Sequence, residues 1–406
     1  MEMESLFGVA LGINPPWEIE SVKFSKETKR LDIKIGFQRG ATFPCPVCGA
    51  QAPAYDTTAK TWRHLNFFQY EAYLTARVPR VKCPHDGCGI KQVEVPWARP
   101  GSGFTLLFEA LIMALVREMP VNAVSALLGE HDTRIWRILD HYVNGARAQS
   151  DYSEVTRIGV DETSARRGQD YISLFFDLDQ GRLLFGTAGK NHETVTAFKE
   201  DLVLHKGVPE KVTDASMDMS KAFIKGITEE FPNAQITFDK FHLIQIMNEA
   251  LGKVRAEEAL LFPELLQGSR YVFLKNPENL TEKQDAMLAT LSHCHLKTGR
   301  AYMIKLALQD VFFAANREDG EARLKRWYNW AIRSQIEQIK KVARTVKNHW
   351  NGVLAWFDSK LTNALVEAVN GLIQSAKRRA RGYRSIKNLV NMAYLIAGKL
   401  DFRLPT

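Results

Sequence analysis

The strand patterns between residues 156 and 189 strongly limit the folds that this chain can adopt. Three consecutive stretches, "TRIGVDETS", "YISLFFDLD" and "RLLFGTAG", are separated only by short polar segments. Apolar and β-branched runs with such breaks predict an antiparallel meander of three strands. Helix and strand patterns then alternate: helices are expected from His192 and in "MSKAFIKGITEEF", and strands in "KVTDAS" and "AQITFDKF".

This order of elements favours an RNase H-like mixed α/β sheet within a multidomain α+β protein. Residues 246–355 show almost only helical periodicity and predict an all-helical insertion. The catalytic domain would then consist of residues 151–245 and 356–406, and the second part would contain a basic helix. Within the insertion, Trp327 and Trp330 are one turn apart and are expected to pack in a core. Stacking on an unpaired base is the alternative.

Two further modules are expected at the N-terminal side. Residues 1–98 combine a β-hairpin pattern over residues 16–37 with four of the five cysteines, which indicates a zinc-ribbon-like β module. Residues 99–150 switch to helical periodicity, and "VNAVSALLG" followed by "HDTRIWRILDHYV" has the glycine-containing turn of a helix-turn-helix. A generic helical hairpin with Trp136 in its core is the alternative.

The charge of the chain indicates the kind of partner. A net charge of +8 favours nucleic acid, because lysines and arginines placed on phosphates release condensed counterions. A basic protein without such a partner is the alternative. No apolar stretch reaches the roughly 18 residues of a membrane span, and the start "MEMESLFGVALG" lacks the basic residues and long apolar core of a secretory signal. We therefore expect a cytoplasmic protein that does not contact the membrane.

The cysteines fall into two close pairs. Cys45 and Cys48 occur in "CPVCG", and Cys83 and Cys88 occur in "CPHDGC". Zinc prefers four soft ligands in a tetrahedron, and a close pair lets one tight turn deliver two thiolates. Because the residues between the pairs alternate like a hairpin, a structural Zn²⁺ fits better than a catalytic one. His85 could replace one cysteine, and four reduced buried cysteines without metal are the alternative.

Three carboxylates occur where an RNase H-like sheet would bring them together. Asp161 lies within the first strand pattern, Asp218 follows the fourth, and Glu367 lies on a late helical pattern. Taken separately, Asp218 could cap the next helix and Glu367 could be a solvated surface acid. Taken together, they would repel one another unless cations neutralised them. Oxygen ligands suit Mg²⁺, and two such ions promote phosphoryl transfer.

Polar neighbours of these acids are candidates for a supporting role. At helical spacing, Asn363 and Asn370 share one stripe with Glu367. Asp239 and His242 stand in "FDKFH" at the end of the fifth strand pattern, where they either position catalytic groups or form a local structural bond. Other acids nearby rank lower or belong to turns: Glu162, Asp214, Asp177 and Asp179.

Two groups of residues are candidates for DNA contacts. The second helix of the helix-turn-helix would present Thr133, Arg134 and Arg137 to a major groove or its phosphates. The basic block after Glu367 would contact phosphates near the scissile bond, a solvated charged face being the alternative. Its members are Lys377, Arg378, Arg379, Arg381, Arg384 and Lys387.

Over nearly its whole length, the chain resembles the insertion sequence L-three family of bacterial DDE transposases. The motifs occur in the family's order: "CPVCG" through "RVKCPHDGC", the helix-turn-helix, "IGVDETS", "SMDMSKAFI", "ITFDKFHL", "LKNPENLTEKQ" and "TNALVEAVNGLIQSAKRRARGYR". By this resemblance Asp161, Asp218 and Glu367 match the metal-binding triad, and the two cysteine pairs match the zinc module. Asp239 and His242 match a family signature whose role is open.

The resemblance implies an enzyme that binds the terminal inverted repeats of its own element and cuts and joins DNA strands. It implies two catalytic Mg²⁺ ions, which Mn²⁺ can replace, and one structural Zn²⁺. We expect a homodimer or higher oligomer on double-stranded DNA, at the nucleoid of a bacterial cytoplasm. Ala364 and Ala368 stand where family members often carry glycine, but no triad acid is lost. The alternatives are a catalytically inactive DNA-binding regulator and an RNase H-like nuclease.

Overall fold

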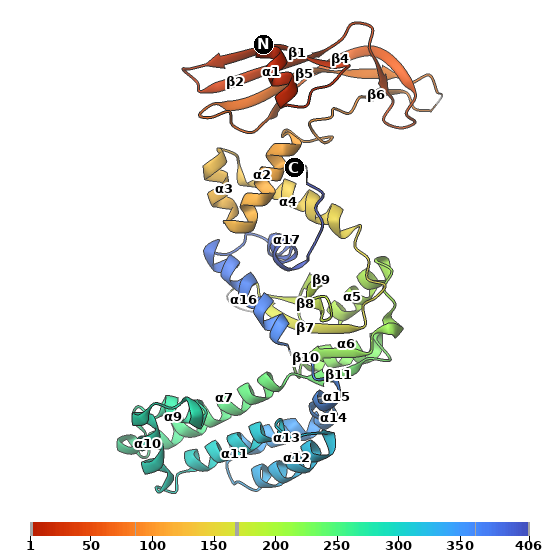
Figure 1. Cartoon of the computed structure of the whole chain (residues 1–406). Helices are drawn as coiled ribbons and strands as arrows, with labels where there is room; N and C mark the ends of the chain where they lie inside the picture. Colours follow the sequence, from red (N-terminus) through yellow and green to blue (C-terminus); the bar gives the residue numbers. More distant parts are fainter. Residues whose placement is uncertain (1–2, 86, 167–169, 362, 405–406) are drawn as a thin grey trace. The chain divides into compact units, whose positions relative to one another are not determined.

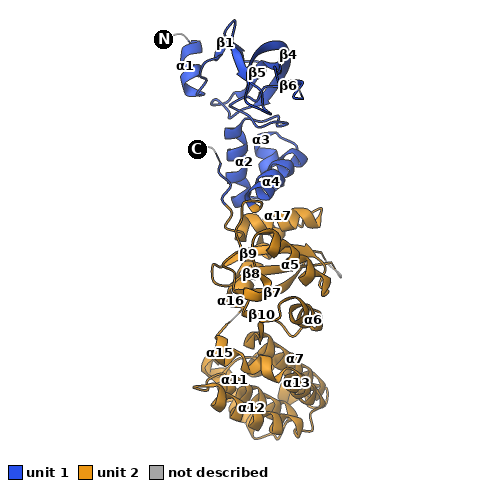
Figure 2. Cartoon of the chain, turned by 90° about the vertical axis from the view of Figure 1, so that its right-hand side faces the viewer, with its two compact units in different colours: residues 1–146, 401–406 blue, residues 147–400 orange. Residues whose placement is uncertain are grey.

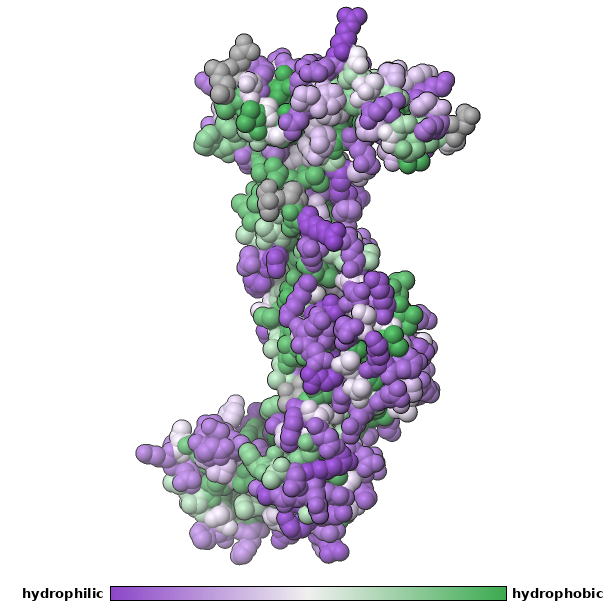
Figure 3. All heavy atoms as spheres, turned by 45° about the vertical axis from the view of Figure 1, so that its right-hand side comes forward, coloured by the Kyte–Doolittle hydropathy of each residue, from purple (hydrophilic) through white to green (hydrophobic). Residues whose placement is uncertain are grey.

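The chain divides into two compact units. The computed structural model (Figure 1) describes residues 3–85, 87–166, 170–361 and 363–404. Residues 1–146 with 401–406 form one unit, and residues 147–400 form the other (Figure 2). Over the described ranges, no helix is both long enough and apolar enough to cross a membrane. Figure 3 shows mainly hydrophilic residues on the visible surface, with hydrophobic residues in smaller groups.

The first unit begins with a six-stranded sheet. Its elements are α1 (Met3–Ala10), β1 (Trp17–Ser25), β2 (Arg30–Phe37), β3 (Thr42–Pro44), β4 (Gln51–Arg63), β5 (Glu71–Lys82) and β6 (Ile90–Gln92). The strand order is β1-β2-β5-β4-β3, and β6 pairs with β5. The antiparallel pair β1 and β2 confirms the predicted hairpin. Leu31, Ile33 and Ile35 are buried, because alternate residues of a strand face the same side.

Three helices follow this sheet: α2 (Leu106–Glu118), α3 (Val121–Leu128) and α4 (Asp132–Arg147). Helix α3 ends at Gly129, whose φ of 68° is left-handed and therefore favours glycine. Helix α4 begins three residues later and buries Ile135, Leu139 and Val143. Two helices joined by a short glycine turn confirm the helix-turn-helix prediction.

The second unit contains a mixed five-stranded sheet. Its strands are β7 (Arg157–Ser164), β8 (Tyr171–Asp177), β9 (Arg182–Ala188), β10 (Asp214–Met217) and β11 (Gln235–Phe238). They lie in the order β11-β10-β7-β8-β9. Strands β7, β8 and β9 form the predicted antiparallel meander, whereas β10 is parallel to both β7 and β11. Because β7 is the central strand, residues near its end lie between those of two neighbours.

Helices contact the sheet from both sides (Figure 1). They are α5 (Glu193–Leu204), α6 (Lys221–Glu230), α16 (Ala364–Arg379) and α17 (Ile386–Ala397), with the short 3-10 turn η1 (Pro209–Lys211) after α5. Phe198 of α5 stacks on Phe175 of β8 with ring centroids 4.4 Å apart. Helix α16 approaches β7 closely at Gly159, where a Cβ atom would lie only 2.8 Å from Val366. Glycine at this position therefore allows α16 to pack directly on the central strand.

A helical insertion lies between β11 and α16, as the sequence predicts. It contains α7 (Lys240–Ala259), α8 (Pro263–Leu266), α9 (Arg270–Leu274), η2 (Pro277–Asn279), α10 (Glu282–Ser292), α11 (Lys297–Val311), α12 (Arg317–Ile332), α13 (Glu337–Asn348), α14 (Trp350–Leu354) and α15 (Trp356–Ser359). Trp327 is buried, and its indole Nε1 donates a hydrogen bond to the carbonyl of Ile304 at 3.0 Å. Trp327 is therefore a core residue, whereas Trp330 is 43% exposed.

The two tryptophans should differ in their contribution to stability. Trp327→Ala removes a buried ring and leaves a cavity, so we expect it to destabilise the insertion by about 3–5 kcal/mol. Trp330→Ala is the matched control and should change stability by less than about 1 kcal/mol, because that ring is partly exposed. Urea unfolding of the full chain, followed by helical circular dichroism, measures both changes. Equal midpoints for the two variants would contradict the assignment of Trp327 to the core.

Candidate functional site

Four cysteine side chains converge from two loops of the N-terminal sheet. Cys45 and Cys48 lie between β3 and β4, and Cys83 and Cys88 lie between β5 and β6. Their Sγ atoms all lie within 4.8 Å of one another. The glycine directly after each pair has a positive φ, of 77° and 66°, which makes each loop tight. Four sulfur atoms at this spacing fit a tetrahedral structural zinc site.

His85 contacts this cluster of four cysteines but does not belong to it. Its Nδ1 lies 3.3 Å from the Sγ of Cys48. A backbone hydrogen bond from Ala50, followed by bonds from His85 and Cys83, lowers the pKa of Cys48 to about 6. Burial is the main reason that the pKa of Cys88 rises to about 12. Because zinc binds deprotonated sulfur, a bound ion would hold all four cysteines as thiolates.

Three carboxylates of the second unit lie level on three neighbouring strands: Asp161 within β7, and Asp218 and Asp239 directly after β10 and β11. Strand β10 is parallel to β7 on one side and to β11 on the other. The last paired residues are Ser216 with Gly159 and Met217 with Phe238. If the same register continues, Asp218 lies level with Asp161 of β7 and with Asp239 after β11. The backbone N–H of Asp239 donates to the carbonyl of Met217 at 3.2 Å, which extends the ladder in this register. The carboxyl ends of parallel strands commonly form binding sites.

Asp161 is held by two hydrogen bonds. The backbone N–H of Glu162 donates to its Oδ1 at 2.7 Å, and Asn370 Nδ2 donates to its Oδ2 at 2.5 Å. Burial raises the pKa of Asp161 to about 6; the charge of His242 opposes this rise and that of Asp218 adds to it. Asp161, Asp218 and His242 therefore interact electrostatically. The predicted proximity of Asp161 and Asp218 is consistent with both the register and these charges.

Helix α16 presents a stripe of polar side chains to the strands. The hydrogen-bonded pairs are Ser216 with Asn363 (2.6 Å), Asp161 with Asn370 (2.5 Å) and Thr163 with Gln374 (2.6 Å). Glu367 lies between Asn363 and Asn370 at helical spacing, so it shares their side of the helix. The two asparagines expected to support the acids therefore connect α16 to β10 and β7, on either side of Glu367.

Two of these partners, Thr163 and Ser216, are not among the site residues expected from the sequence. Thr163 follows Asp161 by two residues, and Ser216 precedes Asp218 by two. Residues two apart on a strand face the same side of the sheet. The two-residue spacing from Asp161 and from Asp218 is thus the sequence signal that could have identified Thr163 and Ser216.

Glu367 forms a close group with Asp239 and His242. One candidate ligand atom from each residue lies within 4.8 Å of the other two. Asp239 is fully buried, whereas Glu367 is exposed. Burial raises the pKa of Asp239, His242 opposes this rise, and the charge of Glu367 adds to it. Glu367 therefore lies beside Asp239 and His242, while Asp161 and Asp218 are outside this tight group of three.

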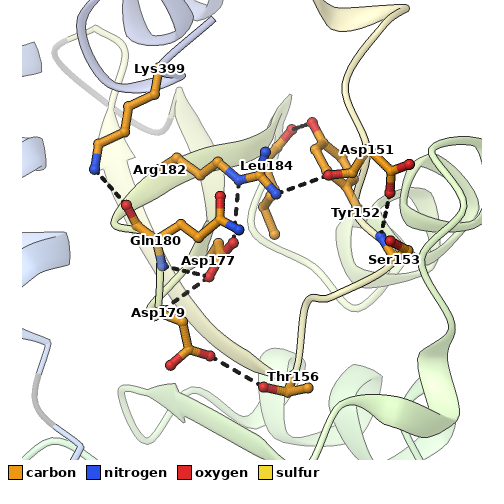
Figure 4. Close-up of polar contacts among 10 residues, drawn as sticks. All are labelled: Asp151, Tyr152, Ser153, Thr156, Asp177, Asp179, Gln180, Arg182, Leu184 and Lys399. Carbon is orange, nitrogen blue, oxygen red and sulfur yellow. Dashed lines mark hydrogen bonds and ion pairs between the residues drawn. The ribbon is translucent and has the colours of Figure 1, made fainter.

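Asp177 and Asp179 belong to the β8–β9 turn, as expected. Figure 4 shows Asp177 accepting hydrogen bonds from the backbone N–H groups of Asp179 and Gln180, both at 3.0 Å. Arg182 also donates to Asp177, at 3.3 Å, and Thr156 donates to Asp179 at 3.2 Å. These partners confirm that both acids stabilise a turn.

The three residues predicted to contact DNA from α4 differ in their surroundings. Thr133 and Arg137 are exposed. Arg134 forms an ion pair with Glu130, and its guanidinium lies 4.0 Å from the ring centroid of Phe104. Arg134 therefore has partners within its own unit, which leaves Arg137 as the more available cation of the two.

The basic block begins in the last turn of α16. Lys377 is half-buried, and its Nζ donates to the carbonyl of Ser164 at 2.5 Å, so it holds α16 against the end of β7. The remaining members are exposed: Arg378, Arg379, Arg381, Arg384 and Lys387. A concentration of exposed cations at the end of the helix that carries Glu367 is suited to binding phosphates.

Three family models match the chain. A model described as a transposase, of the ISL3 type, matches residues 158–393. A model described as the helix-turn-helix domain of transposase family ISL3 matches residues 93–143. A model described as the zinc-finger of transposase IS204/IS1001/IS1096/IS1165 matches residues 41–88. These ranges contain the carboxylate cluster, the helix-turn-helix and the four grouped cysteines.

Similar proteins carry the same description. The transposase for insertion sequence element IS1557 of Mycobacterium tuberculosis is 30% identical, over 96% of this chain and 94% of that protein. The transposase for insertion sequence element IS1001 of Bordetella parapertussis is 26% identical, over 84% of this chain and 85% of that protein. The similarity thus extends over nearly the whole chain.

The cysteine cluster predicts one zinc ion per chain. Cys48→Ser should remove most of this zinc and loosen the N-terminal sheet, because a structural site needs all four ligands. Cys294→Ser is the matched control: Cys294 lies in the insertion, outside the cluster, and its loss should leave the zinc content unchanged. Elemental analysis of the purified full-length proteins measures the metal. Equal zinc in the Cys48→Ser protein and the unsubstituted chain would refute the assignment.

Proposed function

Because the chain belongs to the ISL3 family of transposases, we propose that it cuts and joins DNA at the ends of its own insertion sequence. It recognises terminal inverted repeats and acts by Mg²⁺-dependent phosphoryl transfer. The observation that supports this proposal most strongly is the parallel register of β7, β10 and β11. With this register, Asp161 and Asp218 come to the same edge of the sheet that α16 crosses with Glu367.

We assign the mixed sheet to the RNase H-like class. The order β11-β10-β7-β8-β9, with an antiparallel meander and two added parallel strands, supports this assignment. The catalytic domain consists of residues 151–245 and 356–406, interrupted by the insertion at 246–355. The zinc module spans residues 1–98 and the helix-turn-helix domain spans residues 99–150.

In this proposal Asp161, Asp218 and Glu367 bind two Mg²⁺ ions, which Mn²⁺ can replace. Their side chains offer only oxygen ligands, as Mg²⁺ prefers. The raised pKa of Asp161, caused first by burial, indicates a carboxylate that gains from a bound cation. When bound, two such ions activate the attacking oxygen and stabilise the leaving oxygen of a phosphodiester.

The reaction consists of two transfers at phosphorus. Water first attacks a phosphodiester at the end of the element, and the 3′ oxygen of the element leaves as a hydroxyl. That hydroxyl then attacks a phosphodiester of the target DNA and displaces its 3′ oxygen. The triad acts as ligands and forms no covalent bond to DNA. Asn370 keeps Asp161 oriented through its hydrogen bond to Oδ2.

The DNA is held by two surfaces. Helix α4 enters the groove of the inverted repeat with Thr133 and Arg137, and Arg134 contributes once its ion pair with Glu130 opens. The exposed members of the basic block contact phosphates beside the scissile bond. Two or more copies of the chain bring the two ends of the element together.

Removing one carboxylate charge should abolish cleavage. Asp161→Asn and Asp218→Asn keep the side-chain volume but weaken metal binding, so we expect Mg²⁺-dependent nicking of end-containing DNA to fall by at least about 100-fold. Asp214→Asn is the matched control on β10, at the start of the strand, and should retain nicking. A gel-shift assay should give nearly unchanged end binding for all three. Full nicking by the Asp161→Asn protein would show that the triad is wrongly assigned.

Loss of Arg137 should weaken binding to the element ends. Arg137→Ala removes an exposed cation from α4, and we expect a loss of about 1–3 kcal/mol in binding free energy for a base contact. Lys225→Ala, which removes an exposed cation from α6, is the control and should bind normally. Titrations with the DNA that flanks the coding region, at several salt concentrations, measure the effect. Identical affinities for the Arg137→Ala and unsubstituted proteins at every salt concentration would exclude a contact by Arg137.

A further inference from the structure

Asp239, His242 and Glu367 form an unusual ligand set. Within the described ranges, only two groups of three or more potential metal ligands have ligand atoms within 4.8 Å of one another: the four cysteines and these three residues. The set combines two carboxylates with one imidazole, whereas the proposed triad contains carboxylates alone. A nitrogen ligand among oxygens favours transition metals over Mg²⁺.

Asp239 has one carboxylate oxygen without a partner. Its Oδ1 accepts a hydrogen bond from the backbone N–H of Phe241 at 3.1 Å and so caps α7. Its Oδ2 has no hydrogen-bond partner among the described residues, and water cannot replace one easily because the residue is 0% exposed. A buried polar atom without a partner lowers the stability of the fold by its desolvation free energy, and its presence therefore calls for an explanation. Capping explains only one of the two oxygens.

His242 has the same property. It follows Asp239 by three residues, which places both side chains on one side of the first turn of α7. Its Nε2 is buried, and no described residue forms a hydrogen bond with it. A purely structural pair would instead join Nε2 of His242 to Oδ2 of Asp239. Asp239 and His242 thus each have an unpartnered buried atom, and with Glu367 they bring one candidate ligand atom each within 4.8 Å of the others, as a shared ligand requires.

The side chain of Lys240, the cation next to these residues in the sequence, contacts an aromatic ring. Lys240 lies between Asp239 and His242 in sequence, but its Nζ is 4.7 Å from the ring centroid of Trp356. It therefore lies over an aromatic ring of α15, and its charge is only the last of the causes that lower the pKa of Asp239. The chemistry that fits two carboxylates and an imidazole is a divalent transition-metal ion.

We propose that Asp239, His242 and Glu367 bind a divalent transition-metal ion, with Mn²⁺ as its probe, beside Asp161 and Asp218. This inference rests on the proposed function, since Glu367 belongs to both ligand sets. It gives Asp239 and His242 a direct role as ligands, and it makes the imidazole of His242 the feature that distinguishes this site from an all-carboxylate one.

The test is Mn²⁺ binding to the zinc-loaded full-length chain without DNA. Electron paramagnetic resonance measures free Mn²⁺, and pulsed measurements detect coupling between bound Mn²⁺ and a ¹⁴N nucleus. We expect ¹⁴N coupling in the unsubstituted protein and its loss in His242→Gln, with Mn²⁺ affinity reduced by about 10–100-fold. His293→Gln replaces an exposed histidine of the insertion and should keep both the coupling and the affinity.

A further variant separates ligand loss from misfolding. Glu367→Gln changes an exposed side chain, so its fold and zinc content should be normal. It should bind Mn²⁺ more weakly and still show ¹⁴N coupling from His242. Normal Mn²⁺ affinity in both His242→Gln and Glu367→Gln, or no ¹⁴N coupling in the unsubstituted protein, would overturn the inference.

These results are independent of the nicking assay. If Asp161→Asn abolishes nicking while the unsubstituted protein lacks ¹⁴N coupling, this site fails and the proposed function stands. If ¹⁴N coupling depends on His242 while Asp161→Asn nicks normally, the site stands and the assignment of the triad fails.

Discussion

The burial of carboxylates where β7, β10 and β11 run parallel is the constraint on which the candidate site of the second unit depends. The parallel register of β7, β10 and β11 brings Asp161, Asp218 and Asp239 to the same level. An ionised carboxylate that is buried destabilises the fold unless cations or hydrogen bonds compensate its charge. Burial raises the pKa of both Asp161 and Asp239, which expresses this cost. The divalent ions of the proposed function would offset this cost.

Helix α16 connects this cluster to the positive charge that follows it. Gly159 lets the helix approach β7, and Asn363 and Asn370 attach it to the neighbouring strands. These contacts fix the part of the helix that carries Glu367. The basic block begins about three turns later, and its first member, Lys377, binds the carbonyl of Ser164. In the proposed function the exposed arginines contact DNA phosphates, and the carboxylates bind metal ions.

Much of this arrangement could be predicted from the sequence, because it depends on local patterns. The cysteine pairs indicate zinc by spacing alone, and the position of Asp161 follows from strand alternation. Other features depend on contacts between segments that are far apart in the sequence, so they are harder to predict from it. The grouping of Glu367 with Asp239 and His242 requires both the strand register and the return of the chain after a long insertion. The contact between the guanidinium of Arg134 and the ring of Phe104 likewise joins residues that are far apart in the sequence.

The most direct test of metal binding at the sheet edge is anomalous diffraction at the manganese edge from crystals of the zinc-loaded chain soaked in Mn²⁺. We expect anomalous density among the carboxylates of Asp161, Asp218 and Glu367, and next to His242. Asp177 and Asp179, which stabilise a turn, should show none. Ordered side chains at the sheet edge without any manganese density at saturating Mn²⁺ would contradict the claim that this edge is a metal centre.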